Sequence, residues 1–186
     1  LRRLTSLDVG GSLNTEEDML TMISLSSLRH LFIDDCKLRT KDAKLIAEHL
    51  RGLQTLSIGY NQLFDEGVRA LLQLPALTTL CIAHCDISPA IIPELVAHKT
   101  IKDLSILGND LNDEALQQFV HNPVLTKLNF SGNRVTAAGI RAFLTANKTL
   151  GSFISSDNHL SGKDLIPIEN HSLLELSLSL NSLQSL

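Results

Sequence analysis

The chain has 186 residues, of which 44 % are apolar, only 4 % are aromatic and 37 are leucine. Its net charge of −4 excludes a protein that binds nucleic acid through a strongly basic surface. The apolar fraction excludes a disordered chain, and the apolar runs fall short of the roughly 18 residues that a membrane-spanning helix needs.

The length fits a single domain that comprises residues 1–186. Because the chain is rich in leucine and poor in rings, its core is expected to consist of many similar aliphatic contacts. The first residues, Leu1 to Leu4, contain no initiator methionine and no signal peptide. The chain is therefore expected to be a piece of a longer protein.

Eight copies of the pattern L-x-x-L-x-L-x-x-N-x-L follow one another along the chain, 23 to 25 residues apart. They begin at Leu4, Leu28, Leu53, Leu77, Ile101, Leu125, Leu150 and Leu173. From the second copy to the eighth, the four apolar positions hold apolar residues in 27 of 28 cases, and Ser155 is the exception. Chance does not produce such regularity, so the chain consists of repeats. The pattern resembles the leucine-rich repeat over nearly the whole chain.

The first half of each repeat is predicted to be a short strand. In the third repeat, Leu56 and Ile58 alternate with polar residues, which indicates one buried face and one solvent-exposed face. Strands of successive repeats would stack about 4.8 Å apart into a parallel sheet. The ninth position is expected to bond backbone carbonyl groups of its own and the neighbouring turn, with cysteine as a small, weakly donating substitute for asparagine. It holds Ser12, Cys36, Asn61, Cys85, Asn109, Asn133, Asn158 and Asn181.

The second half of each repeat is predicted to be a helix. Apolar residues recur at i, i+3 and i+4 in the third to the sixth repeat, which places them on one face of a helix, toward the sheet. They are Val68, Leu71 and Leu72; Ile92, Leu95 and Val96; Leu116, Phe119 and Val120; Ile140, Phe143 and Leu144. The predicted helix starts carry N-cap residue types at Asp65, Asn112 and Thr136, and Ser88 before Pro89.

The seventh repeat is expected to be the least regular. It holds Ser155 at a core position, Gly151 just before the strand and Pro167 in its helical half, where proline interrupts the hydrogen bonds of a helix.

Helices are about 10 Å wide and strands only about 4.8 Å apart, so a stack of such repeats must curve. The predicted fold class is α/β: a leucine-rich repeat solenoid, with parallel strands on the concave face and helices on the convex face. Eight repeats would form a right-handed horseshoe arc rather than a closed ring.

The helical half resembles one subgroup of these repeats. The run from Asp65 to Leu72, D-E-G-V-R-A-L-L, is similar to the D-E-G-A-x-A-L-A run of the roughly 24-residue GALA repeats. Weaker similarities lie at residues 112–116 and 138–144. The resemblance implies a relation to ribonuclease-inhibitor-type repeats and to bacterial effectors that act in a host cell, some of which carry an F-box. For such an effector it implies a bacterial cytoplasm first and then a host cell.

The residues that could do chemistry have structural explanations. Cys36 and Cys85 occupy the buried ninth position, and three cysteines without paired spacing predict no disulfide. Cys81, His84 and Cys85 form a C-x-x-H-C cluster, but strand alternation points the two cysteines in different directions, whereas zinc needs three or four converging ligands. The sequence therefore predicts no catalytic residue, no metal, no cofactor and no enzyme.

The remaining candidate is a recognition surface. Small and hydroxyl residues dominate the predicted concave face, but its N-terminal half also carries rings surrounded by charge, a composition typical of interface anchors. The predicted partner-binding residues are His30, Phe32, Asp34, Asp35, Tyr60 and His84. The alternative is that these rings only pack on lateral neighbours in the sheet.

Three functions remain open on the sequence alone. The first is a non-catalytic module that binds a protein partner, and neither nucleic acid nor membrane, through its concave face. The second is the targeting arm of a ubiquitin-ligase adaptor or an enzyme whose active domain lies outside residues 1–186. The third is a structural spacer. A terminal repeat without a cap also leaves an open end at Leu176, Leu178, Leu183 and Leu186. This end is expected to associate end to end with a second copy, to be partly frayed, or to be covered by sequence outside residues 1–186.

Overall fold

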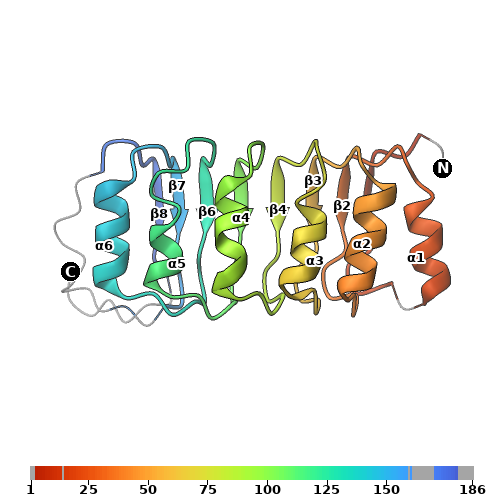
Figure 1. Cartoon of the computed structure of the whole chain (residues 1–186), viewed down its shortest axis with the longest axis horizontal. Coiled ribbons are helices and arrows are strands. Elements are labelled where there is room, and N and C mark those ends of the chain that lie inside the picture. The colour runs from red at the N-terminus through yellow and green to blue at the C-terminus, as the bar shows by residue number, and fades with distance from the viewer. Residues whose placement is uncertain (1–2, 14, 159, 161–169, 180–186) are drawn as a thin grey trace. The chain divides into compact units, whose positions relative to one another are not determined.

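The computed structural model describes residues 3–13, 15–158, 160 and 170–179. The chain forms two compact units, Leu1–Ile101 and Lys102–Leu186. Within each unit, helices lie on one side of a row of short strands (Figure 1).

The first unit contains four strands, and each is parallel to the next. They are β1 (Ser6–Asp8), β2 (His30–Phe32), β3 (Thr55–Ser57) and β4 (Thr79–Cys81). Its helical elements are α1 (Glu16–Ile23), α2 (Thr40–His49), α3 (Phe64–Leu71), the 3₁₀ helix η1 (Pro89–Ile91) and α4 (Ile92–Ala97).

The second unit repeats this arrangement with four more parallel strands. They are β5 (Asp103–Ser105), β6 (Lys127–Asn129), β7 (Ser152–Ile154) and β8 (Glu175–Ser177). The helices described in this unit are α5 (Asp113–Gln117) and α6 (Ala137–Ala146). The prediction of one strand per repeat, eight in all and parallel within each unit, is confirmed, and so is the α/β solenoid class.

Equal positions of successive repeats pair in register, for example Leu31 with Leu56 and Leu56 with Leu80. The middle residue of each strand from β2 to β7 is buried, and the first and third residues are partly exposed. We call the sheet face that carries these first and third residues the open face. No helix among the described residues covers it (Figure 1).

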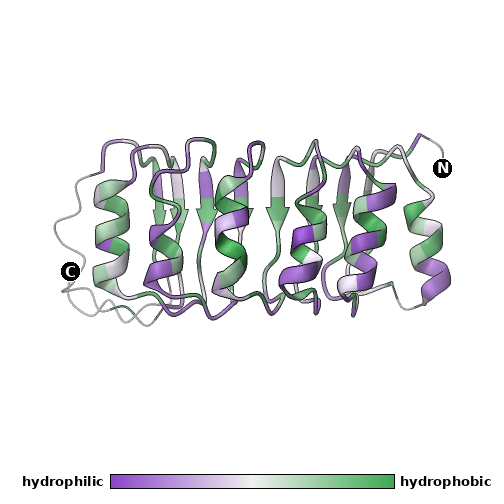
Figure 2. Ribbon diagram, viewed as in Figure 1, coloured by the Kyte–Doolittle hydropathy of each residue, from purple (hydrophilic) through white to green (hydrophobic). Residues whose placement is uncertain are grey.

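The helices bury the faces that the periodicity predicts. Ile140, Phe143 and Leu144 of α6 are fully buried, while Leu72 and Val96 at the ends of their helices are half-buried. Figure 2 shows hydrophilic and hydrophobic residues alternating along the helices, as expected for helices with one buried face. The second unit also buries four phenylalanines completely: Phe119, Phe130, Phe143 and Phe153.

Three of the four predicted helix starts are confirmed. In each, a side-chain oxygen accepts a hydrogen bond from a backbone N–H group that the first helical turn leaves free. The bonds run from Ala115 to Asn112, from Gly139 to Thr136 and from Ala90 to Ser88, at 3.1, 3.1 and 3.2 Å.

The prediction that Asp65 is an N-cap is wrong. Helix α3 begins at Phe64, so Asp65 lies inside the first turn. Its carboxylate instead accepts bonds from the N–H and O–H groups of Ser88, at 2.8 and 2.5 Å, in the next repeat. Asp113 accepts the same two bonds from Thr136, at 2.7 and 2.6 Å. These carboxylates therefore join neighbouring repeats at the helix starts.

The ninth position makes the bonds that the sequence predicts. Asn133 Nδ2 donates to the carbonyl groups of Phe130 and Ser131 in its own turn and of Ile106 in the preceding repeat, each at 3.1 Å. Its Oδ1 accepts the N–H groups of Asn109 and Leu111 at 3.1 and 3.0 Å. One buried amide thus satisfies five backbone groups in two repeats.

Cysteine replaces asparagine at this corner in the second and fourth repeats. Cys36 Sγ donates to the carbonyl of Val9 at 3.4 Å, and Cys85 Sγ donates to that of Ile58 at 3.4 Å. The expected role as a weakly donating substitute is confirmed.

The seventh repeat departs from the pattern where predicted. Ser155 is fully buried, and its hydroxyl oxygen accepts a 2.9 Å bond from Asn158 Nδ2, so the polar core residue is satisfied. Pro167 lies outside the described residues.

In the last repeat, Leu174 is 94 % exposed and Leu176 is 42 % exposed, whereas Leu183 and Leu186 lie outside the described residues. End-to-end association, the horseshoe arc and a single domain of residues 1–186 remain predictions. Among the described residues, no helix is long and apolar enough to cross a membrane.

We expect Asn133→Ala to lower the free energy of unfolding by about 1–3 kcal/mol, because it leaves buried backbone groups without partners. The matched control is Ser105→Ala on the open face, which should change it by less than about 0.5 kcal/mol. Urea denaturation measures both. Equal midpoints would show that the corner amide does not hold the repeats together.

Candidate functional site

The six predicted binding residues lie on the open face and in the turns that follow β2, β3 and β4. His30 and Phe32 are the outer residues of β2. The register places Phe32 between Asp8 of β1 and Ser57 of β3. The remaining four lie beyond the strand ends, at the seventh and eighth positions of their repeats: Asp34, Asp35, Tyr60 and His84.

The eighth position has a left-handed backbone in all seven repeats where it is described. Its φ angles lie between 48° and 68°. The residues are Gly11, Asp35, Tyr60, His84, Gly108, Gly132 and Asp157. We call Asp35, Tyr60 and His84, which follow one another in adjacent repeats, the turn row.

Hydrogen bonds between repeats fix this conformation. The N–H group at the eighth position donates to a carbonyl of the next repeat, from Tyr60 to Ala83 at 2.7 Å and from Asp35 to Gly59 at 2.9 Å. The same bond recurs in the second unit, for example from Gly132 to Ser156 at 2.8 Å. The backbone is therefore left-handed whatever side chain stands there.

Glycine adopts a left-handed backbone without steric cost, whereas a bulky residue pays about 1 kcal/mol or more. Three repeats have glycine at this position, but the third and fourth have a tyrosine and a histidine. Tyr60 and His84 therefore occupy positions where the fold itself favours a residue without a side chain.

The rings of Tyr60 and His84 stack on each other. Their centroids are 4.6 Å apart and their planes differ by 23°. Tyr60 nevertheless remains 56 % exposed. Phe32 and Tyr60, which the sequence placed in one cluster, lie in different columns: Phe32 is level with Ser57, and Tyr60 is level with Asp35.

Asp34 is engaged within the fold. Both of its carboxylate oxygens accept the hydroxyl of Ser57 at 2.8 Å, and Oδ1 accepts the N–H of Gly59 at 2.6 Å. A Cβ at Gly59 would lie only 3.1 Å from that oxygen and 3.0 Å from the carbonyl of Ala83, so glycine permits this close approach. Asp34 thus braces the second repeat against the third, while Asp35 is exposed.

His30 lies on the open face, where its Nδ1 is 3.1 Å from Thr55 Oγ1. A histidine that acts as a catalytic base needs a second group to orient the ring. The Asp34 carboxylate, the acid nearest in sequence, bonds to Ser57 and Gly59 instead.

Phe64 is a surface residue that the sequence reasoning missed. It is 50 % exposed and its φ is 54°, at the position where other repeats have Thr15, Ser88, Asn112 and Thr136 as helix caps. An aromatic residue in a row of capping residues is the signal that could have found it.

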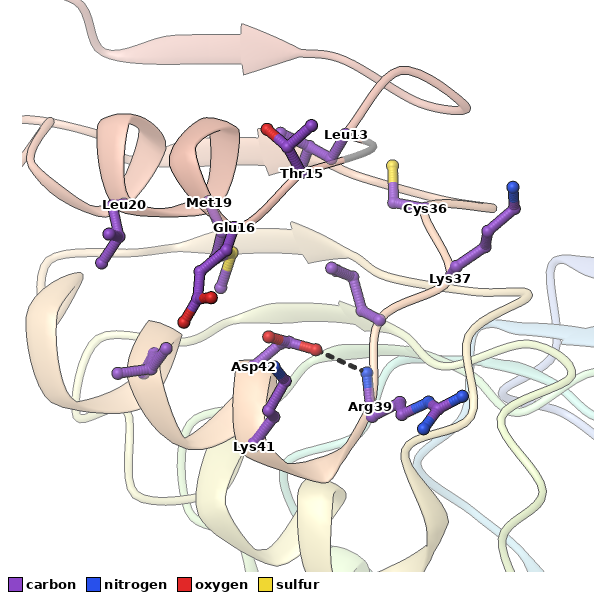
Figure 3. A pocket seen from close by; sticks show the side chains of 12 residues that line it. Leu13, Thr15, Glu16, Met19, Leu20, Cys36, Lys37, Arg39, Lys41 and Asp42 are labelled. Carbon is purple, nitrogen blue, oxygen red and sulfur yellow. Dashed lines mark hydrogen bonds between the residues drawn. The ribbon is translucent and has the colours of Figure 1, made fainter.

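A groove of about 340 Å³ lies on the helix side of the first unit, between α1 and α2 (Figure 3). Met19 and Leu20 line one wall, and Leu20 is 54 % exposed. Its charged residues have mixed signs, and the Asp42 carboxylate accepts the backbone N–H of Arg39 at 2.9 Å. None of the six predicted residues lines it.

The cysteine and histidine cluster does not converge. Cys85 is buried, with its thiol toward the carbonyl of Ile58, whereas Cys81 is half-buried and His84 is exposed. Burial raises the pKa of the Cys85 thiol from 9.0 to about 12. In the part of the chain that the structure describes, no group of three His, Cys, Asp or Glu residues is placed to hold a metal ion.

A sequence model described as a leucine-rich repeat matches residues 49–72 and 121–144. Both segments end in helical halves that the structure places against parallel strands. The chain is a leucine-rich repeat protein. It is 28 % identical to the ribonuclease inhibitor of Mus musculus over 161 residues, which are 76 % of this chain and 35 % of that protein. This leucine-rich repeat chain therefore spans about a third of the length of the curated relative it matches.

Two solved structures share the fold of this leucine-rich repeat chain. The crystal structure of a TLR13–ssRNA13 complex matches with a TM-score of 0.64 and 20 % identity, over 97 % of this chain and 30 % of that chain. The complex of Rad7 and Elc1 in yeast matches with a TM-score of 0.56 and 16 % identity, over 96 % and 64 %. The comparisons do not confirm the narrower resemblance to GALA repeats.

Asp34→Asn should lower the free energy of unfolding by about 1–2 kcal/mol, because an amide cannot accept all the bonds that the carboxylate accepts. Asp35→Asn is the matched control, since asparagine tolerates a left-handed backbone, and it should change the value by less than about 0.5 kcal/mol. Urea titration measures both. A larger effect at Asp35 would overturn the bracing role of Asp34.

Cys81 and Cys85 should react at very different rates with a thiol reagent such as Ellman's reagent at pH 8. With its pKa raised to about 12, Cys85 has on the order of 1 in 10⁴ of its thiol ionised, and it is also buried. We expect Cys81→Ser to remove a faster phase that Cys85→Ser leaves intact, and 8 M urea to equalise the thiols. A fast phase lost with Cys85 would contradict its burial.

Since the neutral thiol is favoured in the fold, Cys85 should contribute stability below pH 9 that is lost as the pH rises toward 12.

Proposed function

We propose that this chain is a non-catalytic protein-binding module whose binding surface is the open face and the turn row of the first unit. The observation that carries the proposal is the exposed stack of Tyr60 on His84 at a left-handed turn. Large rings held rigidly at a surface offer much area to desolvate at a small cost in conformational entropy, which is why they dominate protein interfaces.

The distribution of rings between the units supports this location. The second unit has four phenylalanines, all fully buried. In the first unit, Phe32 is half-buried on the open face, and Tyr60 and Phe64 are exposed. The alternative, that rings on strands only pack on lateral neighbours, fits Phe32 better than Tyr60, because more than half of the Tyr60 side chain faces solvent.

The relatives are consistent with a binding role. One is named for the inhibition of a ribonuclease, and another forms a complex with the protein Elc1. The TLR13 structure contains RNA, but this chain has a net charge of −4, and an acidic residue adjoins Tyr60 in the turn row. Phosphate groups are bound by basic residues, so a protein partner is favoured.

A catalytic role has less support from the geometry. His30 contacts Thr55, but the Asp34 carboxylate that would have to orient a base is bonded elsewhere. The targeting arm of a ubiquitin-ligase adaptor or enzyme, and a bacterial effector acting in a host cell, are narrower forms of the same binding role. The full-length sequence tests both, since an F-box or a catalytic domain would be recognisable there.

Site-specific photo-crosslinking tests the proposed surface. A benzophenone amino acid at Phe32 should capture a partner from the cell of origin, and the same probe at Gln73 on the helix side should not. A spacer would capture nothing specific from either position, and capture through Gln73 alone would place recognition on the helices.

With the captured partner purified, Phe32→Ala and Tyr60→Ala should each weaken binding by about 2 kcal/mol, or roughly 30-fold in Kd. Gln73→Ala is the control and should leave Kd within twofold. Isothermal titration calorimetry measures all three. An affinity that ignores both rings would refute the surface.

A further inference from the structure

The turn row combines two features that the fold does not require. Glycine stands at the same left-handed position in three other repeats, so a side chain there is not needed for folding. Tyr60 and His84 nevertheless hold a stacked ring pair at that position. Residues retained against local backbone preference concentrate at functional sites, which makes this row the strongest candidate for direct recognition.

The row also has an acidic neighbour. His84 of the fourth repeat stacks on one face of Tyr60, which leaves the other face of the ring for a ligand, and Asp35 occupies the same position in the second repeat, on the other side of Tyr60 along the row. Strands of adjacent repeats lie about 4.8 Å apart, which brings an exposed carboxylate within reach of a group resting on that face. Asp86, also exposed, follows two residues after His84.

These carboxylates are available. The ion pairs between described residues join Lys44 to Glu66, Arg69 to Glu94 and Arg134 to Asp110, so neither Asp35 nor Asp86 takes part in them. The base nearest to Asp35 in sequence is Lys37, at the position that Asp86 occupies two repeats later. The row therefore combines the exposed ring of Tyr60 with the carboxylate of Asp35 in the adjacent repeat, and Asp86 adds a second exposed acid two residues after His84.

We propose that the turn row binds an arginine side chain of the protein partner, with the guanidinium stacked on Tyr60 and paired with the carboxylate of Asp35. This inference rests on the proposed function and names the chemistry that it recognises. A guanidinium is planar, stacks on aromatic faces and donates two parallel bonds to a carboxylate. Lysine has the positive charge but no planar group that stacks on the ring. A nucleic-acid base is planar, but its phosphate is negatively charged and is repelled by Asp35 and Asp86.

The chain supplies its own reporter for the test. Tyr60 is the only tyrosine and there is no tryptophan, so tyrosine fluorescence reports on this ring alone. The probe is the capped tripeptide Ac-Gly-Arg-Gly-NH₂, titrated into the whole chain beside its lysine twin, Ac-Gly-Lys-Gly-NH₂. We expect saturable binding of the arginine peptide in the millimolar range, with a Kd at least fivefold below that of the lysine peptide.

Two variants locate the binding. Asp35→Asn should raise the Kd of the arginine peptide at least threefold. Asp157→Asn is the matched control, because Asp157 holds the eighth position in the second unit with a φ of 53° and should leave the Kd unchanged. Tyr60→Gly restores the residue found in three other repeats. It should leave the Tm within about 3 °C of the parent and abolish the preference for arginine, measured by peptide-observed NMR.

Several results would overturn the inference. Equal Kd values for the arginine and lysine peptides would show that charge alone is recognised. Unchanged arginine binding in Tyr60→Gly, or in His84→Gly if the first variant fails to fold, would place recognition elsewhere. If an octauridine quenches the fluorescence of Tyr60 with a lower Kd than the arginine peptide does, the turn row binds RNA instead. If crosslinking through Phe32 still captures a partner in any of these cases, the protein-binding function survives and only the arginine site is lost.

Discussion

The backbone hydrogen bonds that hold adjacent repeats in register are the constraint on which the rest of the structure depends. A strand of three residues has no stability alone, and each becomes stable because its neighbours pair with it in register. The pairing continues beyond the strand into the turn, from Tyr60 to Ala83 and from Asp35 to Gly59. The corner amide then closes the turn, as Asn133 does for five backbone groups.

This continued pairing separates folding from recognition. It fixes a left-handed backbone at the eighth position through main-chain bonds alone, so the side chain there is free to vary. Some repeats have glycine at this position, where the left-handed backbone is not strained. Others have Asp35, Tyr60 or His84, whose backbone is strained and whose side chains are exposed. The seventh position behaves differently. Asp34 bonds to Ser57 and Gly59, so its side chain contributes to the fold itself.

Within one repeat, the sequence predicts nearly everything, because the periodic apolar residues and the N-cap types act locally. The strands and the buried helix faces follow from them. The role of Asn133, which joins two repeats, follows from its ninth position in the repeat pattern. The errors concern contacts between repeats. Asp65 bonds to Ser88, the capping residue of the next repeat, 23 residues away, and no local pattern contains that contact. The charge of Asp34 likewise predicts a binding residue, although its bonds to Ser57 and Gly59 in the next repeat give it a structural role.

A comparison of equivalent positions across repeats recovers part of what local reading misses. Gly11, Gly108 and Gly132 mark the left-handed position, and Tyr60 stands out once they are aligned. The same alignment makes the turn row transferable. The backbone of Gly108 and Gly132 already has the left-handed form, with φ angles of 68° and 58°. The second unit therefore has two equivalent positions in adjacent repeats that carry no side chain. An aromatic pair installed there as Gly108→Tyr and Gly132→His would be held by the same main-chain bonds. The binding surface of this scaffold can therefore be changed by substituting the eighth position of one repeat at a time, without redesign of its core.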